Sequence, residues 1–143
     1  MDANRPHLTA RLLAAMLVLA LPGAAAAGPR EAQIEGYASA ARAANPAFSG
    51  FAAERGKALH TRVFAGAKPD TTACTACHGN DPRSGGRTPA GKAIDPMALS
   101  AAPARYADPA KVEKWFKRNC NEVLGRECTP QEKGDWLSFM FGQ

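Results

Sequence analysis

Cys74-Thr75-Ala76-Cys77-His78 is the stretch that decides how this sequence folds and what it binds. Two thiols three positions apart can each add to one vinyl group of a haem, and the histidine after the second cysteine then becomes a proximal iron ligand. A thioredoxin-like dithiol would require a βαβ context, and a zinc site would require a second close pair of ligands. The sequence offers neither. The segment therefore predicts one covalent haem c, held by Cys74 and Cys77 and ligated by His78.

The first 27 residues have the pattern of a secretory signal peptide. Arg5 and Arg11 give a positive start, Leu12 to Leu21 is a ten-residue apolar run, and a run of alanines follows. A bilayer-spanning helix needs about 20 apolar residues, so this run is too short to remain as an anchor. We expect removal of residues 1–27 on export to the periplasm, which leaves residues 28–143 as a monohaem cytochrome c domain without a membrane span.

The composition describes a short and mildly basic chain. It has 18 basic and 13 acidic side chains in 143 residues, and 16 and 12 remain without residues 1–27, a net charge of +4. The excess is spread along the chain, so it suits acidic partners and is too diffuse to indicate nucleic-acid binding. A domain of this size buries only about two thirds of its unfolded surface and gains from a cofactor. We expect a monomer.

Two helices are predicted before the attachment segment. Residues 31–44 have helical spacing, and Asn45-Pro46 should end this helix because the residue before proline avoids the helical region. A second helix is expected over residues 51–64, with apolar residues on one face. Gly56 on that face lowers helix stability, so its expected use is the close approach of another backbone.

Two further helices are predicted after the attachment segment. Asp108 and Pro109 should begin one that runs to about Asn119, and a capping box at residues 129–132 should begin the last. Residues 79–107 are rich in glycine and proline and are expected to wrap the cofactor as a loop. No strand pattern appears, so the predicted fold class is all-α. The helix around Gly56 should cross the helix around Trp136.

The residues alone leave the second axial ligand open. His60 is interpreted as a surface or core-edge residue, which makes bis-histidine ligation improbable. Met97 in the loop and Met140 on the last helix are the thioether candidates, although Met140 lies where methionine usually packs. Asn119 shares a helical face with apolar residues, and a polar group aimed at a core needs a partner such as iron. The competing interpretation of Asn119 is a helix C-terminal cap.

Cys120 and Cys128 are the two cysteines outside the attachment segment. They are eight residues apart, between the last two helices. In an oxidising compartment a disulfide is the favoured interpretation, and two free thiols are the alternative.

Several segments together resemble the sphaeroides haem protein (SHP) family. The resemblance covers residues 34–137, and its most distinctive part is Asn119-Cys120 with the eight-residue cysteine spacing. The matching segments are Ala53 to Leu59, Lys68 to Asp70, Cys74 to Gly79, Ile94 to Pro96, Glu113 to Phe116, Arg118 to Asn121 and Gly125 to Thr129. The sequence departs from the family pattern at Met97, which keeps methionine ligation open.

The resemblance implies a small class I cytochrome c-like domain. In that family the asparagine before the first late cysteine ligates ferric iron and the late cysteines form a disulfide, which assigns these roles to Asn119, Cys120 and Cys128. It also implies that the asparagine leaves on reduction, so that a small gas such as O2, NO or CO can bind.

The leading functional hypothesis is an exported monohaem cytochrome that transfers one electron and binds a diatomic gas when reduced. Two alternatives stay open: a low-spin electron shuttle ligated by His78 and Met97, and a haem enzyme that converts nitric oxide or oxygen. No dedicated acid–base group supports an enzyme, so a carrier is the favoured class. By family analogy, a dihaem cytochrome c or a membrane cytochrome b is the expected redox partner.

Overall fold

The structure, a computed structural model, describes Met1 and residues 28–65 and 68–143. Residues 2–27 of the predicted signal peptide lie outside the described residues. Across the described part of the chain, no helix combines the length and the apolar character that crossing a membrane requires.

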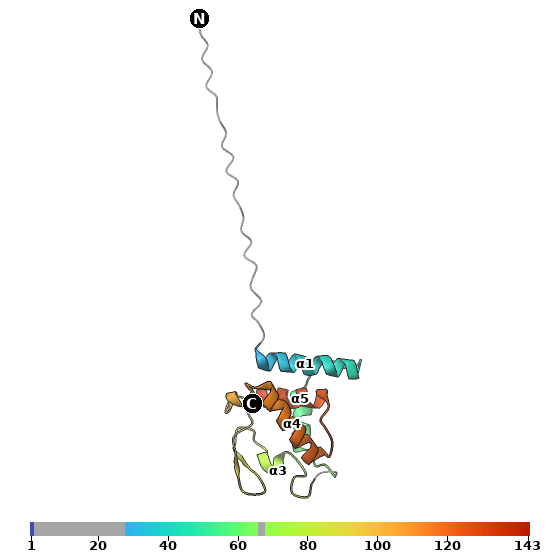
Figure 1. Cartoon of the computed structure of the whole chain (residues 1–143), viewed down its shortest axis with the longest axis vertical. Coiled ribbons are helices and arrows are strands. Elements are labelled where there is room, and N and C mark those ends of the chain that lie inside the picture. The colour runs from blue at the N-terminus through green and yellow to red at the C-terminus, as the bar shows by residue number, and fades with distance from the viewer. Residues whose placement is uncertain (2–27, 66–67) are drawn as a thin grey trace.

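The fold is helical, as predicted, with one very small sheet. Figure 1 shows α1 lying across one end of the folded body and α3 at the opposite end. The elements in chain order are α1 (Pro29–Ala44), α2 (Ala53–Thr61), α3 (Thr75–His78), β1 (Gly86–Arg87), β2 (Ala93–Ile94), the 3-10 helix η1 (Pro103–Tyr106), α4 (Pro109–Leu124) and α5 (Pro130–Phe141).

Local capping signals determine where the main helices begin and end. The Asp108 carboxylate accepts hydrogen bonds from the backbone amides of Ala110 and Lys111, and Pro109 takes the first helical position of α4. Thr129 and Glu132 form a reciprocal capping box at the start of α5. α1 ends at Ala44, one residue before Asn45, so these three boundaries confirm the predictions made for them.

α2 crosses α5 at a point where the two backbones touch. A Cβ atom added at Gly56 would lie 2.0 Å from the backbone oxygen of Asp135 and 2.9 Å from Cβ of Phe139. Only a residue without a side chain permits that approach. Buried Asp135 strengthens the same crossing, because its carboxylate accepts hydrogen bonds of 2.8 Å from the Ala52 amide and the Arg55 guanidinium. The predicted crossing and the predicted use of Gly56 are confirmed.

Three predicted elements differ from the structure, and the first is α2, which spans Ala53–Thr61 and is shorter than the expected residues 51–64. α4 continues to Leu124 instead of ending near Asn119, and Gly125 ends it in the left-handed conformation with φ 72°. The loop after the attachment segment is not free of strands, because Gly86 pairs with Ile94 and Arg87 with Ala93 in an antiparallel ladder. Two residue pairs are too short to leave an alternating pattern in the sequence.

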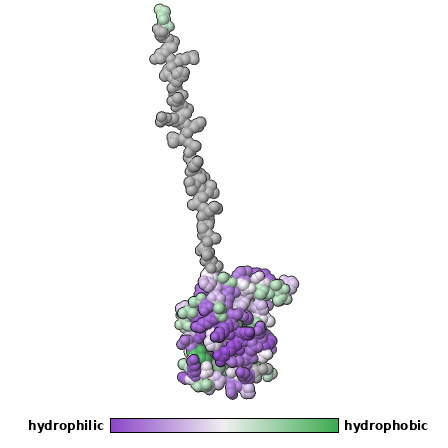
Figure 2. Space-filling view, viewed as in Figure 1, coloured by the Kyte–Doolittle hydropathy of each residue, from purple (hydrophilic) through white to green (hydrophobic). Residues whose placement is uncertain are grey.

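α4 is amphipathic, with cations outside and apolar residues inside. Figure 2 shows a mainly hydrophilic face over this helix. The exposed cations of α4 are Lys111, Lys114, Lys117 and Arg118. Its buried side chains are Val112, Phe116, Cys120 and Val123, and the first three of these pack into the core together with Leu137 and Met140 of α5.

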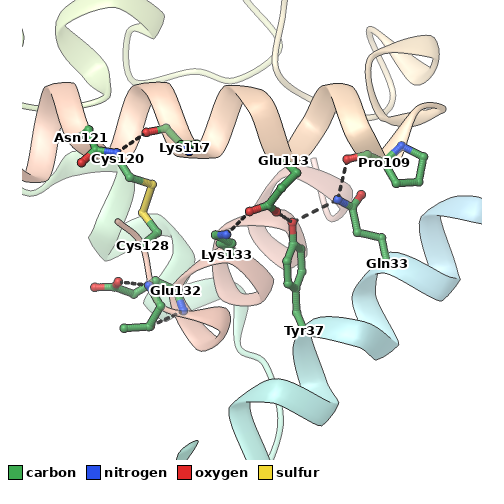
Figure 3. A network of polar contacts seen from close by, with 11 residues as sticks. Gln33, Tyr37, Pro109, Glu113, Lys117, Cys120, Asn121, Cys128, Glu132 and Lys133 are labelled. Atoms are coloured by element: carbon green, nitrogen blue, oxygen red, sulfur yellow. Dashed lines mark hydrogen bonds and ion pairs between the residues drawn. A yellow bond between two sulfur atoms is a disulfide. The ribbon is translucent and has the colours of Figure 1, made fainter. Parts of the chain in front are cut away.

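A polar network ties α1 to α4 and α5 (Figure 3). The Tyr37 hydroxyl donates a 2.5 Å hydrogen bond to the Glu113 carboxylate, which also pairs with Lys133. Gln33 bonds to the Tyr37 hydroxyl and to the Pro109 carbonyl. Through this network, polar groups of α4 and α5 hold α1 on the outside of the domain.

Replacing Gly56 with alanine is expected to destabilise the holoprotein by about 1–3 kcal/mol, because the new methyl group overlaps the backbone of α5. Gly36, on the exposed side of α1, has no atom within 4 Å of an added Cβ. Gly36→Ala is the control and should stabilise by up to about 1 kcal/mol. Denaturant unfolding measures both, and equal effects of the two changes would contradict the contact.

The stability of the protein should decrease as the pH is lowered and Glu113 becomes protonated. Burial raises the pKa of this carboxyl, but hydrogen bonds from Lys133 and Tyr37 outweigh burial and hold it below 4.5. The stability contributed by Glu113 is therefore present above pH 4.5 and lost as pH falls through the lower folded pKa. Urea unfolding midpoints measured on both sides of that value test this. Glu113→Gln should show a smaller drop, and an unchanged drop would contradict the assignment.

Candidate functional site

The attachment segment forms a single helical turn. The amide of His78 donates to the carbonyl of Cys74 at 3.0 Å, and the amide of Gly79 donates to the carbonyl of Thr75 at 2.9 Å. Gly79 then turns the chain away with φ 68°. Both thiols and the imidazole are partly buried and come from this one turn. The turn was not predicted as a helix because four residues carry no periodic signal.

Burial sets the protonation states of these groups. It raises the pKa of the Cys74 thiol to about 11 and raises that of Cys77, to which the Glu122 carboxylate also contributes. It is also the main cause that lowers the pKa of His78 to about 4, with smaller electrostatic contributions from His60 and Arg105. His78 is therefore neutral at physiological pH, which is the form that can ligate a metal.

His78 also has an unmet polar atom. Its Nδ1 is buried and has no hydrogen-bond partner among the described residues. An uncompensated ring nitrogen in the interior is costly unless a group outside the polypeptide completes the site. The backbone at Gly86 packs directly against the attachment turn, because a Cβ atom added at Gly86 would lie 2.1 Å from the Cys77 carbonyl oxygen. Two thiols, a neutral imidazole and a sheltered turn together suit a covalently held haem.

Asn119 lies in the interior of α4 and cannot be a helix cap. It precedes the end of the helix at Leu124 by more than one turn, and the cap position is Gly125. Its position along α4, between buried Phe116 and Val123, puts it beside the buried face, and it is itself half-buried. The Asn119 amide makes no hydrogen bond with any residue that the structure describes. The cap interpretation is wrong.

The part of α4 that carries Asn119 lies beside the chain that leads into the attachment turn. The backbone oxygen of Glu122, less than one turn beyond Asn119, accepts from the Lys68 amide at 3.3 Å and from the Thr71 hydroxyl at 3.4 Å. The Glu122 carboxylate is also close enough to raise the pKa of Cys77. Asn119 and the attachment turn therefore lie on adjacent parts of the structure, although they are far apart in the sequence.

The two methionine candidates differ in their surroundings. Met140 is fully buried in the core cluster, as expected for packing. Met97 is also buried, and its backbone is held by the Pro82 carbonyl and the Tyr106 hydroxyl. The Arg105 guanidinium donates hydrogen bonds to the carbonyls of Asp95 and Pro96, the two residues that precede Met97. Met97 is therefore part of a firmly held loop and of the core.

His60 is the residue that the sequence interpretation placed wrongly. It is fully buried, and burial lowers its pKa. Its ring centroid lies 6.5 Å from that of His78. A signal for this position was present, since His60 follows Gly56 by four residues and so shares the face that meets α5.

Cys120 and Cys128 are joined by a disulfide in the structure (Figure 3), with Cα atoms 5.5 Å apart. Because α4 extends beyond Asn119, Cys120 lies inside the helix, and the link ties its last turns to the residue before the Thr129 cap.

Comparisons with known proteins agree with this arrangement. The profile of the family described as "Domain of unknown function (DUF1924)" matches residues 46–140. The chain is 48% identical over 133 residues to "Cytochrome c-type protein SHP" of Cereibacter sphaeroides, which covers 93% of this chain and 98% of that protein. It is 33% identical over 105 residues to "Cytochrome c''" of Methylophilus methylotrophus, covering 73% of each.

Solved structures show the same fold. Oxidised SHP, described as "an oxygen binding cytochrome c", superposes with a TM-score of 0.74 at 46% identity, covering 81% of this chain and 98% of that one. Oxidised cytochrome c'' superposes with a TM-score of 0.71 at 32% identity, covering 80% and 94%.

A small helical domain of this fold, with one two-thiol turn that ends in histidine, defines a c-type cytochrome whose cofactor is one covalently bound haem c. The chain belongs to the SHP family of these cytochromes.

The disulfide predicts a specific thiol count. The haem-loaded protein should react with no iodoacetamide before reduction and with two equivalents afterwards, at Cys120 and Cys128. Replacing both with serine should cost about 2–3 kcal/mol of stability, since the closed loop is short. Labelling of either cysteine without a reductant would contradict the bridge.

Proposed function

We propose that this chain is an exported one-electron haem protein whose reduced form binds a diatomic gas. Cys74 and Cys77 hold the haem through thioethers, His78 is the proximal ligand, and Asn119 ligates ferric iron and leaves on reduction. A bound haem supplies one-electron chemistry and an iron coordination position for the gas. The observation that carries the proposal is the Asn119 amide, half-buried inside α4 and without a hydrogen-bond partner in the part of the chain that the structure describes.

The chemistry of Asn119 gives the redox dependence. An amide oxygen is a hard, weak donor, so it favours ferric over ferrous iron. A methionine thioether such as that of Met97 has the opposite preference and would raise the reduction potential. A ligand that leaves on reduction frees a position beside the buried face of α4, sheltered from bulk water. The relative described as oxygen binding supports a gas as the occupant of that position.

Export and partnership complete the proposal. Residues 1–27 act as the signal peptide and residues 28–143 form the monohaem domain that works as a monomer in the periplasm. The exposed cations of α4 suit an acidic redox partner, such as a dihaem cytochrome c or the exposed part of a membrane cytochrome b.

Asn119→Ala tests the ligand directly. The ferric protein should show shifted charge-transfer bands in absorption and an altered high-spin signal in electron paramagnetic resonance, and ferric iron should bind cyanide about tenfold more tightly because no internal ligand competes. The ferrous protein should still bind carbon monoxide, since Asn119 has already left in that state.

Asn121→Ala is the matched control. Asn121 is also on α4, but it is exposed and its amide donates to the Lys117 carbonyl at 2.6 Å. It should leave both spectra and cyanide affinity unchanged. A ferric methionine charge-transfer band in the wild-type protein that disappears in Met97→Leu would identify Met97, and not Asn119, as the second ligand of ferric iron. Unchanged ferric spectra and an unchanged cyanide affinity in Asn119→Ala would also overturn the proposal.

A further inference from the structure

His60 is a fully buried histidine to which the proposed function gives no role. It lies on α2 between α5 and the attachment turn. Its ring centroid is 6.3 Å from that of Trp136, 5.9 Å from that of Phe139 and 6.5 Å from that of His78. A polar ring in an aromatic interior requires a partner for each nitrogen.

Both nitrogens of His60 have a partner, and the partners fix its tautomer. Nε2 lies 3.0 Å from the carbonyl oxygen of Gly79, which can only accept, so Nε2 carries the proton. Nδ1 lies 3.4 Å from the indole nitrogen of Trp136, which can only donate, so Nδ1 is the acceptor. One hydrogen-bonded chain therefore runs from α5 through neutral His60 to the Gly79 peptide.

That chain ends on the carbonyl of Gly79, the residue directly after His78. Metal-bound histidines are ordinarily oriented by an acceptor for their other ring nitrogen. Neither ring nitrogen of His78 makes a hydrogen bond with a described residue, so no such acceptor orients its ring. The hydrogen bond from His60 instead restrains the next residue, Gly79, through its carbonyl, just where Gly79 turns with φ 68°.

We propose that His60 is a positioning residue that sets the orientation of the His78 imidazole by holding the Gly79 carbonyl against the crossing of α2 and α5. The inference rests on the proposed function only in taking His78 as the axial ligand. It requires neither Asn119 nor a particular gas. Without the hydrogen bond from His60, the Gly79 carbonyl would no longer be held, and the orientation of the neighbouring His78 imidazole would be less restricted.

The test uses the haem-loaded protein in its reduced state. His60→Phe keeps an aromatic ring of similar size and removes both hydrogen bonds. The iron–histidine stretching band in resonance Raman spectra should shift and broaden, and the carbon monoxide dissociation constant should change by about tenfold. His60→Gln should largely restore the wild-type band, because its amide nitrogen can donate to the Gly79 carbonyl from nearly the position of Nε2.

Arg55→Gln is the matched control for a general loosening of the helix crossing. Arg55 pairs with Asp135 at 2.8 Å across the same two helices and does not bond to Gly79. This variant should lower the unfolding midpoint and leave the stretching band in place. An equal band shift in Arg55→Gln, or an unchanged band in His60→Phe, overturns the inference. If His78 is not the axial ligand, the wild-type protein itself lacks the band, which separates that failure from this one.

Discussion

The backbone contact between α2 and α5 at Gly56 is the constraint on which the other features depend. With the two helices this close, the residue one turn later on α2 must lie against α5, which brings His60 to Trp136 and Phe139. The carboxylate of Asp135 reinforces the contact by binding the start of α2 through Ala52 and Arg55. The close contact at Gly56 thus positions His60, and His60 in turn holds the attachment turn through its hydrogen bond to the carbonyl of Gly79.

Polar side chains without hydrogen-bond partners mark the cofactor site. Buried side chains in a folded domain normally satisfy their hydrogen bonds internally. Among the described residues, His78 keeps a buried ring nitrogen without a partner and the half-buried Asn119 amide makes no hydrogen bond, while Asp135 and His60 are fully satisfied. The contrast separates side chains that support the fold from side chains whose partner is not part of the polypeptide.

The sequence predicted the features that depend on neighbouring residues. The caps at Asp108 and Thr129 are local hydrogen bonds, and the attachment motif is a spacing rule, so both can be derived from a few consecutive residues. The end of α4 was misplaced because Asn119 is as common at a helix end as inside a site, and Gly125 was the stronger end signal. His60 was missed because its burial depends on α5, which lies 70 or more residues away in the sequence.

The way α4 is held explains how a weak ligand could leave without disturbing the fold. Asp108 caps the start of the helix, Gly125 ends it, and the bridge from Cys120 to Cys128 ties its last turns to the start of α5. Asn119 adjoins that bridged residue, so its backbone is restrained on both sides. In the proposed site, release of the amide on reduction is then confined to rotation of one side chain, which costs far less than melting a helical turn. A rigid helix that carries a labile ligand keeps the vacated position open for a gas.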